Sequence, residues 1–162
     1  MQIKLRSIEH SEAMSEETFC YTAKVYIDGK LAGTARNDGK GGSTIISPRE
    51  CEERLEAYAL TLPDRVYKAG TPDQFTLKMT ADMLVDDLLV EHLQAKDLKG
   101  HFKKDVLFTV EGEPGVRRMK NMTPERFLAH PRLSSLNVDK VLNQLPFEEA
   151  LNIYKTAINA IV

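Results

Sequence analysis

The sequence contains no tryptophan and only two cysteines, Cys20 and Cys51, among its 162 residues. Two cysteines are too few for the paired motifs of a zinc knuckle or for the dense disulfide framework of a small secreted domain. We therefore expect both to be ordinary, partly buried thiols. At this length, a chain with 42% hydrophobic residues can bury a core without disulfides or a structural metal.

Long apolar runs are also absent. The longest, such as Leu88-Leu89-Val90, span three or four residues, far short of the roughly 18 that suggest a membrane span. The N-terminal residues Met1 to Arg6 alternate in polarity and lack the continuous apolar stretch of a signal peptide. We therefore expect a cytoplasmic protein that contacts no membrane.

No recognised catalytic motif occurs in the chain. The four histidines are scattered and none adjoins a known nucleophile motif. A glycine-rich stretch, Gly39-Lys40-Gly41-Gly42, could form a backbone anion nest. Its spacing matches neither the nucleotide-binding nor the dinucleotide-binding glycine pattern. The sequence thus favours a non-enzymatic protein without a cofactor.

One group of carboxylates leaves a catalytic alternative open. Asp82 and Asp86 lie four residues apart on an expected helix, and so do Asp87 and Glu91. Paired carboxylates can bind Mg²⁺ or act as acid and base, which would suit a metal-dependent hydrolase. A solvated helix face produces the same spacing.

The hydrophobic periodicity changes along the chain from that of strands to that of helices. We expect strands over residues 2–8, 19–27, 31–36, 106–110 and 116–120. Helices are expected over 48–62, from Thr76 or Thr80 to about residue 94, over 124–130 and over 146–161. The segments 63–72 and 95–105 are expected to be connectors. This order predicts a single α+β domain over residues 1–162, with an antiparallel sheet covered on one face by two or three helices.

A tight turn at Asp28-Gly29 is expected to join the second and third strands. A two-residue turn would pair Ile27 with Lys30, whereas a three-residue turn would pair it with Leu31. We favour the longer turn because it keeps the apolar side chains of both strands on one face. The same register pairs Val25 with Gly33 and Ala23 with Ala35. The small residues Gly33 and Ala35 would leave room for a helix to lie across the sheet.

The net charge of −2 conceals an uneven distribution. Residues 1–95 carry 11 basic and 16 acidic side chains, whereas residues 96–132 carry 9 and 5. Such a bipolar chain suits a macromolecular partner. The predicted binding residues are Lys99, His101, Lys103, Lys104, Arg117 and Arg118. Residues predicted to shape a second surface are Asn37, Asp38, Gly39 and Gly41.

Residues 19–62 resemble a double-stranded RNA-binding domain. The likeness lies in the run from Val25 to Lys30, the loop from Gly39 to Ser43, and a following helix that contains Tyr58. That family has a basic cluster at the start of this helix, where the present chain has Glu50, Glu52 and Glu53, and a helix before the first strand. The resemblance implies a nucleic-acid-binding protein.

Residues 15–43 also resemble small phage and prophage-type proteins of unassigned function. The shared features are the Asp28-Gly29-Lys30 hairpin and the Asn37-Asp38-Gly39-Lys40-Gly41-Gly42 loop. This resemblance implies a mobile-element origin. Our leading hypothesis is an accessory protein that binds a host or phage protein. Nucleic-acid binding and metal-dependent hydrolysis are the alternatives, and the sequence leaves the oligomeric state open.

Overall fold

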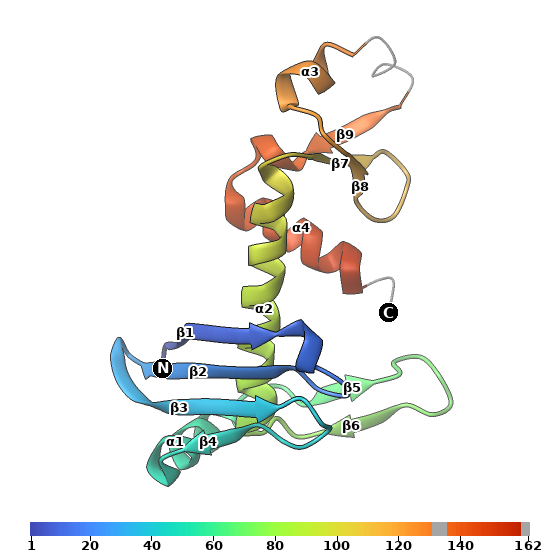
Figure 1. The fold of residues 1–162 in the computed structure, drawn as a ribbon. Coiled ribbons are helices and arrows are strands. Elements are labelled where there is room, and N and C mark those ends of the chain that lie inside the picture. The colour runs from blue at the N-terminus through green and yellow to red at the C-terminus, as the bar shows by residue number, and fades with distance from the viewer. Residues whose placement is uncertain (131–135, 160–162) are drawn as a thin grey trace. The chain divides into compact units, whose positions relative to one another are not determined.

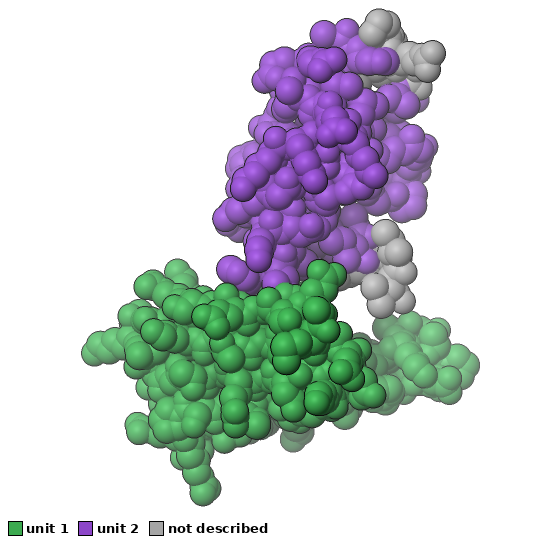
Figure 2. All heavy atoms as spheres, viewed as in Figure 1, with its two compact units in different colours: residues 1–90 green, residues 91–162 purple. Residues whose placement is uncertain are grey.

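The structure is a computed structural model that describes residues 1–130 and 136–159. The chain divides into two compact units, residues 1–90 and residues 91–162 (Figure 2). Helices and antiparallel sheets occur in both, which confirms the α+β class. The number of domains stays a prediction. No helix in the described part of the chain is long and apolar enough to cross a membrane.

A four-stranded antiparallel sheet forms the body of the first unit (Figure 1). Its strands follow the chain in the order β1 (Ile3–Ser11), β2 (Cys20–Ile27), β3 (Lys30–Asp38) and β4 (Ile45–Ser47), with a short 3₁₀ helix, η1 (Glu12–Met14), after β1. Alternate side chains of β2 are buried, among them Tyr21, Val25 and Ile27, each at most 2% exposed. This confirms that the apolar residues of β2 share one face of the sheet.

The hairpin between β2 and β3 differs from the expected one. Asp28 and Gly29 both have positive φ and form a two-residue turn that pairs Ile27 with Lys30. The three-residue turn that we favoured was therefore wrong. The register shifts by one residue after the next pair, Tyr26 with Leu31, so that Val25 still faces Gly33. A β-bulge thus reconciles the tight turn with the apolar pairing.

Two helices cover the inner face of this sheet. Helix α1 (Arg49–Ala59) buries Cys51 and Leu55. A Cβ at Gly33 would lie 2.3 Å from the Ser47 carbonyl oxygen and 2.9 Å from the Cys51 Sγ. The missing side chain at Gly33 therefore allows α1 to approach, as expected. Both cysteines are free thiols, Cys51 buried and Cys20 partly buried.

Helix α2 (Ala81–Phe102) is longer than its sequence suggested, because it continues through most of the segment that we expected to be a loop. The fully buried Leu98 explains this continuation. A second departure precedes α2. The expected connector contains β5 (Arg65–Tyr67), and β5 pairs with β6 (Phe75–Leu77) in a two-stranded sheet.

The second unit contains a three-stranded sheet with a hydrophobic cluster on each face. Its strands and helices are β7 (Val106–Val110), β8 (Arg117–Met119), α3 (Pro124–Leu128), β9 (Val138–Val141), the 3₁₀ helix η3 (Leu142–Gln144) and α4 (Phe147–Asn159). The central strand β7 alternates between the clusters. Phe108 packs with Phe127 of α3, whereas Leu107 packs with Leu98 and Leu151 from α2 and α4. Residues 160 and 161, the last two of the expected C-terminal helix, lie outside the described residues.

Candidate binding surface

Asp105 organises the junction between α2 and β7. Its side chain is 3% exposed, and one carboxylate oxygen accepts a 3.1 Å hydrogen bond from the Asn121 backbone N–H. The other oxygen lies 3.1 Å from His101 Nδ1 and 3.9 Å from Arg118 Nε. The Asp105 carbonyl accepts a further bond from the Asn143 amide. One buried carboxylate thus joins the end of α2 to β8 and the turn after it.

His101 is held between two carboxylates. Its Nδ1 faces Asp105, and its Nε2 lies 3.6 Å from an Asp97 oxygen that also accepts the Tyr154 hydroxyl. The Arg118 guanidinium lies 3.3 Å from His101 Nδ1. Because both ring nitrogens are engaged, this arrangement favours a positioned side chain over a general base.

The Asp105 contacts bring two basic segments together. Lys103 and Lys104 follow α2, and the Met122 N–H beyond β8 donates to the Lys104 carbonyl at 3.1 Å. Next to this hydrogen bond, β7 pairs with β8 in antiparallel fashion, so the segment after Lys104 and the segment that carries Arg118 lie side by side. We use the name basic end for the five residues that result: His101, Lys103, Lys104, Arg118 and Lys120. All but His101 are exposed.

Two of the predicted binding residues lie apart from the basic end. Arg117 pairs with Glu113, and its place opposite Phe108 puts it on the other face of the sheet from Arg118. The Lys99 ammonium lies 4.9 Å from the centre of the Phe147 ring, in a cation–π contact. The structure therefore brings together four of the six basic candidates. It adds Lys120, which the sequence analysis did not select, although its positive charge could have identified it.

Phe102, next to these cations in the sequence, does not join the surface. It is partly buried in the cluster beneath α4, and its ring meets Phe147 edge-on with the centroids 6.4 Å apart. A surface that binds bases by stacking needs an aromatic face open to the ligand. The Phe102 ring is instead part of the core.

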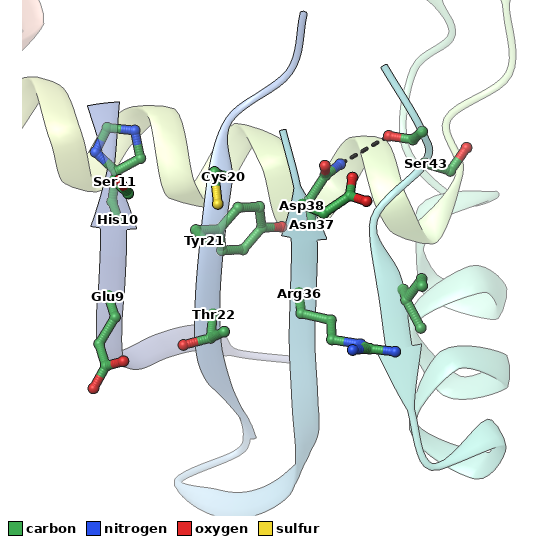
Figure 3. Close-up of a pocket in the computed structure, with 12 residues that line it drawn as sticks. Glu9, His10, Ser11, Cys20, Tyr21, Thr22, Arg36, Asn37, Asp38 and Ser43 are labelled. Carbon is green, nitrogen blue, oxygen red and sulfur yellow. Dashed lines mark hydrogen bonds between the residues drawn. The ribbon is translucent and has the colours of Figure 1, made fainter. Parts of the chain in front are cut away.

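The second predicted surface is built largely from internal contacts. Asn37 is 6% exposed, and its side chain accepts from the Gly39 N–H and donates to the Gly42 carbonyl at 2.8 Å (Figure 3). The Gly39 carbonyl accepts three backbone N–H groups from residues 16–18. Gly41 donates its N–H to Thr18. Asn37, Gly39 and Gly41 therefore fix the shape of the loop.

Asp38, the fourth member of that set, is exposed. It lines a hollow of about 570 Å³ on the sheet, together with Cys20, Thr22 and Arg36 (Figure 3). These residues belong to the first unit, whereas the basic end belongs to the second. The two predicted surfaces are therefore parts of different units.

The four helix carboxylates have separate partners. Asp86 accepts from Thr44 at 2.6 Å and from the Tyr21 hydroxyl at 2.9 Å. Burial raises the pKa of Tyr21, and the Asp86 carboxylate adds to the shift. The remaining contacts are Asp82 with Thr80, Asp87 with Arg65, and Glu91 with Lys155. Among the described residues, no three His, Cys, Asp or Glu side chains could hold a metal ion together.

No family model, curated protein or solved structure matches the chain. The resemblances to double-stranded RNA-binding domains and to phage proteins therefore stay expectations. The residues before β2 form the strand β1, where the RNA-binding family has a helix. Function is inferred from the surfaces alone.

Replacing Asp105 with asparagine should destabilise the second unit at neutral pH and less so in acid. Burial acts to raise the pKa of Asp105, but the Asn121 N–H, His101 and Arg118 outweigh it and hold the pKa below its usual value. The ionised group therefore stabilises the fold above the unfolded pKa of about 4, and this contribution is lost as the pH falls through the folded pKa.

Urea unfolding of the wild type and Asp105→Asn at pH 7 and pH 3 measures this effect. The difference in unfolding free energy between the two proteins should shrink at pH 3. Glu111→Gln, at an exposed position in the same unit, is the matched control and should show little difference at either pH. An equal loss for Asp105→Asn at both pH values would contradict a role for the ionised carboxylate.

Proposed function

We propose that the protein is a non-enzymatic, cytoplasmic accessory protein that binds an acidic surface of a protein partner through its basic end. The observation that carries this proposal is the Asp105 junction, which joins two basic segments into one exposed surface. Charges at such a surface steer association and select partners of opposite sign. The resemblance to phage proteins makes a host protein complex the first partner to test.

The composition of the basic end favours a protein over a nucleic acid. The carboxylates of Asp97 and Asp105 lie beside His101, and that of Asp105 also lies 3.9 Å from Arg118. The neighbouring Phe102 ring packs inside the unit. Binding of a single strand by base stacking requires an aromatic face that is open to the ligand. Hydrogen-bonded pairs such as His101 with Asp105 are better suited to a surface that presents both donors and acceptors.

The test is a comparison of proteins recovered from nuclease-treated host lysate with tagged wild type and with the triple variant Lys103→Glu, Lys104→Glu, Lys120→Glu. In the described residues, none of these lysine side chains forms a hydrogen bond or ion pair, so the fold should be retained. Like charges across an interface cost several kcal/mol, so recovery of a direct partner should fall about tenfold or more.

Lys68→Glu, an exposed lysine of the first unit, is the control and should leave recovery unchanged. Quantitative mass spectrometry of the recovered proteins gives the readout. Equal recovery with the triple variant would contradict the proposal. A parallel recovery from untreated lysate completes the test, and a partner recovered only without nuclease would also count against the proposal, in favour of nucleic acid.

A further inference from the structure

The outer face of the four-stranded sheet carries cations although its unit is acidic in sequence. The inner face is covered, because Tyr21 bonds Asp86 of α2 and Gly33 abuts Cys51 of α1. On β2 and β3, the side chains that alternate with the buried ones are exposed or partly exposed. On β1, Lys4 and Arg6 are exposed and pair with residues of that same face of β2. We use the name sheet face for six of these: Lys4, Arg6, Thr22, Lys24, Tyr26 and Arg36.

Strand register makes the sheet face continuous. Arg6 lies directly opposite Lys24, Lys4 opposite Tyr26, and Thr22 opposite Arg36. Directly opposite residues have Cβ atoms about 5 Å apart, so each cation has a neighbour within reach of a single ligand. Among the described residues, no ion pair involves any of these four cations.

An aromatic contact lies within this basic surface. The Arg6 guanidinium lies 4.7 Å above the centre of the Tyr26 ring. Two apolar side chains flank the same face: Leu31, opposite Tyr26, and Ile45, opposite Arg36, which are 57% and 55% exposed. Exposed apolar groups beside unpaired cations suit a ligand that has both flat apolar rings and negative charge.

The hollow lies at one end of the sheet face. Figure 3 shows Glu9, Thr22 and Arg36 in a row across three strands, with Cys20 and Asp38 beyond them. Glu9 and Asp38 place two carboxylates at this end of the sheet face. Hydroxyl, carboxylate and guanidinium groups together offer both donors and acceptors to the polar edge of a base.

We propose that the sheet face binds single-stranded nucleic acid. Lys4, Arg6, Lys24 and Arg36 contact phosphates, a base stacks on the Arg6–Tyr26 pair, and the hollow admits a neighbouring base. Stacking requires bases released from pairing, so a single strand fits where a duplex does not. This site lies in the first unit and uses none of the residues of the basic end, so it extends the proposed function.

Fluorescence anisotropy with a labelled 20-nucleotide oligothymidylate tests the proposal on the full chain. Four phosphate contacts to a single strand predict that Kd rises about 50-fold between 50 and 200 mM salt. Lys24→Gln with Arg36→Gln should remove about half of that salt dependence. Tyr26→Leu should weaken binding about tenfold and leave the salt dependence unchanged. Circular dichroism verifies that each variant is folded.

Lys68→Gln with Lys78→Gln is the matched control, because both lysines are exposed in the same unit but lie outside the sheet face, and it should leave oligothymidylate binding unchanged. The proposal is overturned if the wild type does not bind at 50 mM salt, or if a 20-base-pair duplex binds as tightly. Polyglutamate competing as well as oligothymidylate would overturn it in favour of an acidic protein. Loss of binding in the control pair alone would contradict the assignment of the phosphate contacts to the sheet face, and the lysate experiment tests the basic end separately.

Discussion

Replacing Phe127 with alanine is expected to lower the unfolding free energy of the second unit by about 3–5 kcal/mol, the usual cost of removing a buried phenylalanine. Phe127 is 1% exposed and stands at the centre of the cluster that α3 makes with β7. Its ring centroid lies 4.8 Å from that of Phe108. The short helix α3 offers few other contacts that could collapse into the space left behind.

The next residue provides a matched control for Phe127. Leu128 is on the same helix but 45% exposed, so Leu128→Ala should cost well under 1 kcal/mol. Urea unfolding, together with amide hydrogen exchange of β7 and β9, measures the loss where it should occur. Similar losses in the two variants would show that α3 contributes to stability as a whole helix and not through the Phe127 ring.

The second large effect is expected at Gly39, where alanine should destabilise the first unit by about 2–5 kcal/mol. Gly39 has φ of +84°, a region that costs other residues about 1–2 kcal/mol. A Cβ there would also lie 2.2 Å from the Met14 carbonyl oxygen, so the backbone must move at a further cost of about 1–3 kcal/mol. That movement would disrupt the three N–H bonds to the Gly39 carbonyl.

Gly42, in the same loop, provides the matched control for Gly39. A Cβ at Gly42 meets nothing within 4 Å and its φ is not positive, so Gly42→Ala should be neutral or slightly stabilising. Thermal unfolding of the two variants compares these effects. If Gly39→Ala were as stable as wild type but lost a binding activity, Gly39 would belong to a recognition surface, as the sequence suggested, and not to the loop's internal support.

The hairpin illustrates how far local pattern predicts this fold. Alternation in β2 correctly identified the face that Val25 and Ala23 share, because burial on one side of a sheet imposes a period of two. Turn chemistry at Asp28-Gly29 and the apolar pairing require different registers. A bulge satisfies both, and bulges leave no periodic signal in a sequence.

The ends of elements were harder to predict, since long-range packing determines them. Helix α2 continues past the expected stop because Leu98 packs with Leu107 and Leu151, residues that follow later in the chain. For the same reason β5 and β6 were not predicted, because each of these short strands forms only by pairing with the other. The sequence shows which residues are basic, but not which of them lie together in the folded protein.

Asp105 shows why the site itself was only partly predictable. It stands between a basic run and an apolar strand, with nothing local to distinguish it from a solvated aspartate. Its partners, Asn121, Arg118 and Asn143, come from segments 13 to 38 residues further along the chain. Only the fold makes it the residue that determines where the neighbouring cations lie.

The placement of charge in the first unit has a consequence before any contact forms. Helix α1, on the inner side of the sheet, carries four glutamates, Glu50, Glu52, Glu53 and Glu56, against two arginines. The outer side of the sheet carries the four cations of the sheet face against Glu9 and Asp38, so the two sides have net charges of opposite sign. Opposite charges on two sides of one small body make a permanent electric dipole. An approaching polyanion would exert a torque on that dipole and turn the sheet toward itself, so that productive orientations are enriched among encounters, at a rate that added salt reduces.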